Sequence, residues 1–247
     1  MPITPNQVTV LRVGLAFVAV ALFGLAPAGF AARYGWVNLV ALGLIIAAIA
    51  LDAVDGWLAR RYRLATPLGA QLDILGDRVI ENLFFTFFAV CGLVSLWVPV
   101  TFFVRGTLTD FLRGLAARAG KSGFGRNSML EMWWGRALVA SRASRGAYAA
   151  LKCLCFCFLG AEWALLHGAA NGFGLAGAFG YGALRLGQNI LVSATVGFCL
   201  VRALPVVWEG RRYLAAFDRS GAAKMRLLQP RPTRASQPHA ARAASVQ

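Results

Sequence analysis

The chain alternates long apolar runs with short groups of polar and charged residues, and this pattern predicts six membrane-spanning helices. One crossing needs about 20 predominantly apolar residues. Thr66 followed by Pro67 is typical of a helix start, because threonine caps the first backbone amides and proline suits the first helical position. The predicted spans are residues 12–31, 36–60, 67–93, 97–118, 146–168 and 180–208.

Segments outside these spans predict different structures. Residues 4–12 form an amphipathic stretch that we expect to lie along the membrane interface as a short helix. The segment 126–140, with its paired tryptophans, is typical of a second interfacial helix. After residue 217 the composition turns to Ala, Arg, Pro, Ser and Gln, which cannot build a core. We therefore expect a transmembrane domain over 1–217 and a disordered basic tail over 218–247.

Composition supports an integral membrane protein. The 247 residues are 58% hydrophobic, and the mean hydropathy is +0.62, which is too apolar for an ordinary soluble domain. The formal net charge of +15 would suggest nucleic acid as the partner of a soluble chain. Here the basic residues fall between and after the apolar runs, so anionic lipid headgroups are the expected partner and nucleic acid is not.

The distribution of basic residues predicts the orientation. Lysine and arginine are concentrated in 60–66, in 113–145 and in the tail, whereas 94–97 and 168–179 contain none. This alternation places both termini, and the connection between the second and third spans, in the cytoplasm. A multi-pass protein of the plasma (inner) membrane is expected.

Four aspartates stand at the cytoplasmic ends of the second and third spans. Asp52 and Asp55 are three residues apart and Asp73 and Asp77 are four apart, so each pair lies on one helix face. The whole chain has only 10 acidic residues, so the grouping is not background. Four carboxylates brought together need neutralisation, and divalent cations with oxygen ligands would supply it.

The spacing around these aspartates is specific. It reads Asp52-x2-Asp55-Gly-x2-Ala-Arg60-x8-Gly69-x3-Asp73-x3-Asp77, and at all eight fixed positions it resembles the signature of the CDP-alcohol phosphatidyltransferase family. The resemblance implies a membrane enzyme that moves a phosphatidyl group from a CDP-linked lipid, such as CDP-diacylglycerol, to an alcohol and releases CMP. It also implies six transmembrane helices with a cytoplasmic active site, and homodimers are common in the family.

The resemblance implies roles for individual residues. The four aspartates would hold two divalent cations, Mg²⁺ or Mn²⁺, and Asp77 would also act as general base on the acceptor hydroxyl. A stretch from Pro5 to Arg12 resembles the start of the family's first helix, near the nucleotide. The residues implied to bind the CDP-lipid are Thr9, Gly56, Ala59, Arg60 and Gly69.

Basic residues further along indicate the acceptor. Arg105 and Arg113 share a helix face and resemble the fourth-helix pattern of the glycerol-phosphate branch, although Gly106 stands where that branch has glutamate. The alternative is a pair of arginines that only reach toward the interface. Arg142 and Arg145 resemble the basic start of the fifth helix, and Arg185 is a further candidate.

Three functions remain open at this point. Glycerol 3-phosphate is the first choice of acceptor, because so many basic residues favour an anion. Inositol phosphate, inositol, serine or an aminoalcohol are the alternatives for the same chemistry. A non-catalytic cation transporter is a remote third, since polar residues at mid-membrane on several spans and an internal repeat are both missing from the sequence.

Overall fold

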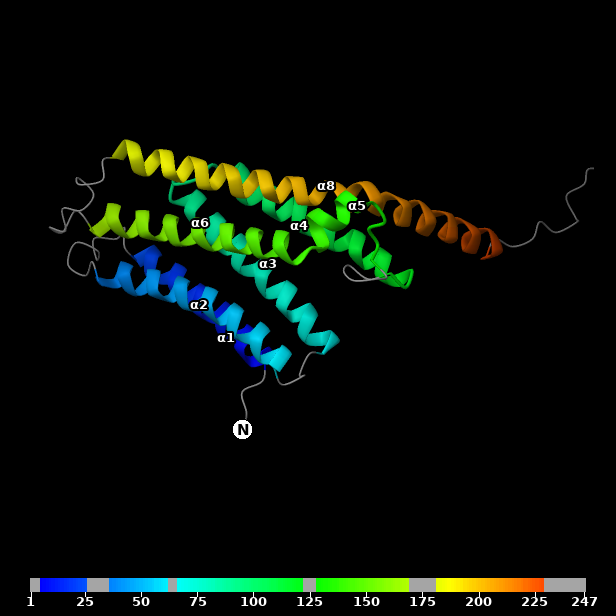
Figure 1. Cartoon of the computed structure of the whole chain (residues 1–247), viewed down its shortest axis with the longest axis horizontal. Coiled ribbons are helices and arrows are strands. Elements are labelled where there is room, and N and C mark those ends of the chain that lie inside the picture. Colours follow the sequence, from blue (N-terminus) through cyan, green and yellow to red (C-terminus); the bar gives the residue numbers. More distant parts are fainter. Residues whose placement is uncertain (1–4, 26–35, 62–65, 122–127, 169–180, 229–247) are drawn as a thin grey trace, which may run out of the picture.

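The chain forms a bundle of long helices in the computed structural model, which describes residues 5–25, 36–61, 66–121, 128–168 and 181–228. Consecutive long helices run in alternate directions along the bundle (Figure 1). The elements are α1 (Pro5–Leu25), α2 (Trp36–Arg61), α3 (Pro67–Val90), α4 (Trp97–Arg118), α5 (Trp133–Gly135), a π-helical segment η2 (Arg136–Ala140), α6 (Arg142–Gly168) and α8 (Tyr181–Leu228).

Each long helix overlaps one of the six predicted apolar runs, so the all-helical prediction is confirmed, although α1 begins earlier and α8 ends later than predicted. The separate interfacial helix at 4–12 is wrong, because α1 is continuous from Pro5 to Leu25. The polar residues Thr9 and Arg12, which suggested an interface, are buried in the bundle instead. The boundary expected at 217 falls inside α8, which continues to Leu228. Residues 229–247 lie outside the described part, so the tail stays a prediction.

The start of α3 has the predicted cap. The backbone N–H of Gly69 donates a hydrogen bond to Oγ1 of Thr66 at 3.0 Å, and Pro67 is the first helical residue. These two residues therefore fix where α3 begins. As a consequence Asp73 and Asp77 lie in its early turns, close to the end of α2.

An aromatic core occupies the second half of α3. Phe85 stacks on Phe102 of α4 with ring centroids 4.4 Å apart, and Phe84 meets Phe156 of α6 edge to face at 5.2 Å. These rings are almost fully buried, and such pairs add stability beyond the area they bury. Helix α3 thus joins a charged first half to an apolar second half.

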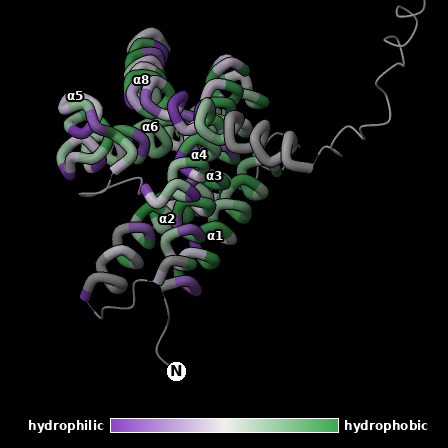
Figure 2. Tube along the Cα trace, turned by 90° about the vertical axis from the view of Figure 1, so that its right-hand side faces the viewer, coloured by the Kyte–Doolittle hydropathy of each residue, from purple (hydrophilic) through white to green (hydrophobic). Residues whose placement is uncertain are grey.

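Several helices indicate a multi-pass membrane protein. Among the residues that the structure describes, three segments are long and apolar enough to cross a bilayer: Asn6–Leu25, Arg142–Leu165 and Gly182–Phe217. Large apolar side chains also lie on the outside of the bundle, for example Leu39 at 60% and Phe103 at 61% exposure. Figure 2 shows apolar positions along most of each helix, interrupted by hydrophilic ones. Of the other long helices, α2 contains a shorter apolar stretch over Trp36–Asp52, and α3 and α4 each carry several charged residues.

The segment 128–140 is folded onto α4 and α8. The carboxylate of Glu209 on α8 is fully buried and accepts the backbone N–H groups of Glu131 at 2.6 Å and Met132 at 3.2 Å. A Cβ atom at Gly135 would lie 3.2 Å from Glu209 Oε1, so the close approach favours glycine there. A small apolar cluster completes the attachment: Ala116, Met129, Leu130, Val139 and Val206. In place of the expected interfacial helix the segment contains only the short α5 and η2, although Trp133 is 81% exposed.

Candidate active site

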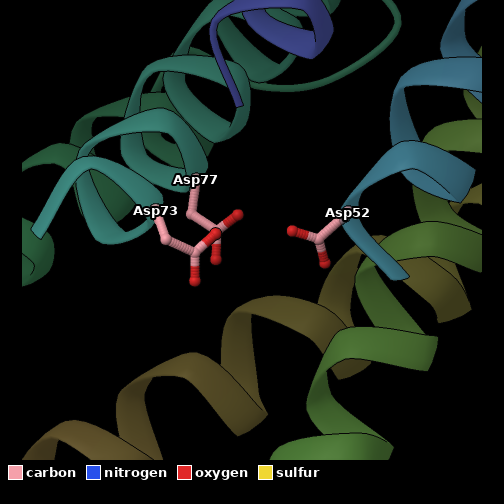
Figure 3. Close-up of side chains that lie close together, drawn as sticks. All are labelled: Asp52, Asp73 and Asp77. Atoms are coloured by element: carbon pink, nitrogen blue, oxygen red, sulfur yellow. The ribbon is translucent and has the colours of Figure 1, made fainter. Parts of the chain in front are cut away.

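Three aspartates from two helices converge at one end of the bundle. Asp52 comes from the last third of α2, whereas Asp73 and Asp77 come from the first half of α3. Figure 3 shows Asp73 and Asp77 next to each other on one helix, with Asp52 facing them from the other. One carboxylate oxygen of each residue lies within 4.8 Å of the others, and the side chains are about half exposed. We call these three residues the carboxylate cluster.

The donor set of this cluster suits a hard divalent cation. Magnesium and calcium prefer carboxylate oxygens, and Mg²⁺ also keeps several of its waters. Half-exposed carboxylates leave room for those waters, and they can still move toward an ion. The residues present therefore fit the metal that the family resemblance implies.

A buried arginine reaches into the carboxylate cluster from α1. The guanidinium of Arg12 donates hydrogen bonds to Asp52 and, at 2.7 Å, to Asp73, and it lies 3.1 Å from Asp77. It also donates to the backbone oxygen of Asp73 at 3.2 Å. Gly76 makes the passage possible, since a Cβ atom there would lie 3.3 Å from Arg12 Nη2. The family resemblance implied a place for Arg12 near the nucleotide, but the sequence did not predict its ion pairs with the aspartates.

The fourth predicted metal ligand and part of the CDP-lipid set cannot be placed atom by atom. Asp55 lies on α2 three residues after Asp52, but its side chain is outside the described part, as are those of Ala59 and Arg60. Gly56 is partly exposed on the same helix. Their predicted roles stay predictions.

Thr9 and Gly69 lie where α1 meets α3. Thr9 is 6% exposed, and its Cγ2 atom lies 3.1 Å from the place of a Cβ atom on Gly76. A Cβ atom on Gly69 would come within 2.8 Å of the side-chain oxygen of Asn6. Small or compact residues therefore let α1 and α3 approach closely beside the carboxylate cluster.

Arg78 follows Asp77 directly but pairs with carboxylates outside the cluster. It binds Asp110 of α4 at 2.9 Å and Glu81, one turn further along α3, also at 2.9 Å. Its side chain passes against Gly106, where a Cβ atom would lie 3.3 Å from it. The glycine that departs from the glycerol-phosphate pattern thus makes room for Arg78.

Two hollows meet at Asp77. The smaller holds about 80 Å³ and contains Arg12, Asp52 and Asp77 in its wall. The larger, which we call the cationic cleft, holds about 210 Å³. Asp77, Ala149 and Lys152 line both. A carboxylate shared by two neighbouring hollows can face a ligand in each of them.

Six basic side chains line the cationic cleft. Three of the four predicted acceptor residues are among them, but Arg142 is not, being exposed at the first turn of α6. Arg185, the further candidate, does not lie in the cleft either. It stands near the beginning of α8, at the end of the bundle opposite the carboxylate cluster (Figure 1). The basic residues of the cleft are Arg78, Arg105, Arg113, Arg145, Lys152 and Arg202.

Sequence reasoning missed Arg202 and Tyr148 in this cleft. Arg202 interrupts an otherwise apolar stretch of α8, and a charge inside a span is a functional candidate by default. That signal was present in the sequence. Tyr148 carried no such signal, because a single tyrosine in an apolar helix is common in any core.

Comparisons with known proteins agree with this geometry. A family model described as CDP-alcohol phosphatidyltransferase matches residues 2–180. The chain is similar to three proteins named CDP-diacylglycerol–glycerol-3-phosphate 3-phosphatidyltransferase. The one from Pseudomonas fluorescens is 40% identical over 76 residues, which are 31% of this chain and only 35% of that protein. The one from Yersinia pestis (strain Pestoides F) is 30% identical over 150 residues, 60% of this chain and 75% of that protein. The one from Sodalis glossinidius is 30% identical over 135 residues, 53% of this chain and 68% of that protein.

Proposed function

From the premise that the chain belongs to the CDP-alcohol phosphatidyltransferase family, we propose that it transfers a phosphatidyl group from CDP-diacylglycerol to glycerol 3-phosphate. The single observation that carries this proposal is the meeting of a carboxylate cluster and a cationic cleft at Asp77. The relatives named for glycerol 3-phosphate support the choice of acceptor.

In the proposed reaction the acceptor hydroxyl oxygen attacks the phosphorus that carries the diacylglycerol. A new P–O bond forms, the bond between that phosphorus and the bridging oxygen of CMP breaks, and CMP leaves with the electron pair. The hydroxyl proton passes to Asp77, which faces the cationic cleft. A positioned base of this kind contributes about 10²–10⁴-fold to the rate.

Asp52, Asp73 and Asp77, with Asp55, are the residues that would hold the divalent cations. Bound there, the cations would neutralise the diphosphate and its developing charge. Arg12 already places one fixed positive charge between the same carboxylates. Because it is buried, it keeps the aspartates facing one another rather than spread toward solvent.

Surplus positive charge in the cationic cleft favours an anionic acceptor. Arg78, Arg113 and Lys152 each pair with Glu81 or Asp110. Arg105 and Arg202, by contrast, are buried, and no ion pair joins either to a carboxylate among the described residues. Buried cations need a counter-charge, and a phosphomonoester would supply it through bidentate contacts. Inositol phosphate is the second candidate, whereas serine, free inositol or an aminoalcohol would leave the cleft uncompensated.

The proposed placement in the membrane has six spans: α1, α2, α3, α4, α6 and α8. Helices α3 and α4 would cross despite their charges, because these charges face the site and one another. In this arrangement both termini and the active site are cytoplasmic, in the plasma (inner) membrane. The division into a membrane domain and a tail, whose expected limit at 217 falls inside α8, and a homodimer stay predictions.

The decisive experiment is CMP release by the purified protein with CDP-diacylglycerol and a panel of acceptors. We expect release with glycerol 3-phosphate in Mg²⁺ or Mn²⁺, and none after chelation, because the carboxylates would then repel the diphosphate. Readdition of the metal should restore activity.

Two results would overturn parts of the proposal separately. Release with serine, choline or free inositol, and with no phosphorylated alcohol, would remove the acceptor assignment and keep the family reaction. A protein that binds divalent cations and releases no CMP with any acceptor would favour the transporter alternative. Against that alternative, the described carboxylates of the cluster lie at one end of the bundle only.

A further inference from the structure

Three cations surround the ring of Tyr148. The distances to the ring centroid are 4.9 Å for Lys152 Nζ, 5.3 Å for Arg202 Cζ and 5.8 Å for Arg105 Cζ. Lys152 stands one turn after Tyr148 on α6, whereas Arg202 comes from α8 and Arg105 from α4. Tyr148 itself is 7% exposed and lines the cationic cleft. One aromatic side chain therefore contacts basic residues from three helices.

Other contacts hold these cations only in part: the Arg202 guanidinium donates to the backbone oxygens of Leu138 at 2.7 Å and Val139 at 3.3 Å, and Lys152 pairs with Glu81. Arg105 and Arg202 are both buried, and the Nε atom of each has no hydrogen-bond partner in the described part of the protein. Like charges at this range repel, and the low polarity around them strengthens the repulsion. The face of an aromatic ring carries partial negative charge and attracts cations within about 6 Å. The Tyr148 ring therefore offsets part of the repulsion without adding a carboxylate that would compete with an anionic ligand.

The phenol of Tyr148 has a separate partner. Its O–H donates a hydrogen bond to Oε1 of Glu81 at 3.2 Å. Glu81 also binds Lys152 at 3.4 Å, and the edge of Phe198 meets the Tyr148 ring at 5.7 Å and 87°. Ring and hydroxyl thus make different contacts, and substitution can separate them.

We propose that Tyr148 is a positioning residue for the acceptor: its ring holds Arg105, Lys152 and Arg202 so that they face a phosphomonoester in the cationic cleft. The inference rests on the proposed function, because it assigns the cleft to the acceptor. It assigns the effect to the ring and only a minor part to the hydroxyl. Tyr148 does not take part in bond making.

The test compares Tyr148→Leu, which removes the ring, with Tyr148→Phe, which keeps it. In Tyr148→Leu we expect the KM for glycerol 3-phosphate to rise about tenfold or more, equivalent to about 1.4 kcal/mol, while the KM for CDP-diacylglycerol stays within about twofold. In Tyr148→Phe the acceptor KM should rise by no more than about threefold. Tyr213→Leu is the matched control, since Tyr213 packs against the separate apolar cluster on α4 and α8.

Thermal stabilisation by CDP-diacylglycerol in detergent checks that each variant is folded. If Tyr148→Leu fails this check, Tyr148→Met replaces it, because the flexible methionine side chain adapts to an irregular gap without a ring. The inference is overturned if the ring-less variant keeps the wild-type acceptor KM, if both substrates lose affinity equally, or if Tyr148→Phe matches the ring-less variant. A wild-type protein that uses no phosphorylated alcohol would instead overturn the proposed function.

Discussion

The guanidinium of Arg12 lies among three carboxylates that come from two other helices. It is 1% exposed, whereas the aspartates are about half exposed. The arginine therefore cannot exchange its partners for water, but the aspartates can. This asymmetry makes Arg12 the fixed member of the group and leaves the carboxylates free to turn toward an added cation.

Replacing Arg12 by Gln should destabilise the protein most when metal is absent. Breaking a buried ion pair costs about 3–5 kcal/mol, and the exposure of the aspartates reduces this to about 2–3 kcal/mol. Thermal unfolding in detergent, with chelator and with Mg²⁺, measures the difference. We expect Mg²⁺ to recover more stability in Arg12→Gln than in wild type, and Arg12→Lys to lie between them. An equal loss in both conditions would contradict this account of Arg12.

At the scale of elements, the sequence was sufficient to predict the long helices but not the contacts that hold the elements together. Apolar runs bounded by charges located each long helix, and Thr66-Pro67 located the start of α3. The position of α1 was misjudged, because Thr9 and Arg12 look interfacial until α3 is known to cover them. The attachment of 128–140 was invisible as well, since it depends on Glu209, 78 residues after Glu131. Local patterns predict elements, whereas buried polar contacts between distant residues must be seen in the fold.

The attachment of 128–140 should fail in Glu209→Ala. Two backbone N–H groups would lose their charged acceptor, and such hydrogen bonds are worth about 1.5–3 kcal/mol. We expect a loss of about 2–4 kcal/mol in the free energy of unfolding, together with faster proteolysis within 128–140.

Glu131→Ala is the control for that experiment. The Arg212 guanidinium, 2.8 Å from Glu131, holds the pKa of this carboxyl below its ordinary value. Both side chains are nevertheless about half exposed, so the pair should add little to stability. If Glu131→Ala were as harmful as Glu209→Ala, the surface pair and not the buried carboxylate would hold the segment.

Across the whole molecule, apolar packing and the charged site occupy different halves of the bundle. Aromatic packing of Phe84, Phe85 and Phe88 fills one half, whereas the carboxylate cluster and the cationic cleft lie in the other. Helices α3 and α4 carry the charges of the site along their length, whereas the described segments that are long and apolar enough to cross a bilayer belong to α1, α6 and α8. If the proposed six-span arrangement holds, composition alone misses the spans that build the site.

Cysteine labelling tests the resulting topology. In a background without the five native cysteines, we expect Ala65→Cys to react with an impermeant reagent only from the cytoplasmic side. Ala176→Cys should react only from the outside, since basic residues surround the first position and not the second. Labelling of both positions from one side would contradict the three crossings, α3, α4 and α6, that the proposed topology places between them.

The contacts of Arg12 and Arg78 have a further consequence for how the chain is made. A polypeptide is synthesised from its N-terminus, so Arg12 has already emerged when Asp52, Asp73 and Asp77 follow. Arg78 likewise precedes Glu81 by three residues. The described acidic side chains of the first three helices therefore find counter-charges before α4 exists. Arg105, Arg145 and Arg202 are synthesised later and are not required for that early neutralisation. Selection can therefore change them to suit a substrate without disturbing membrane insertion.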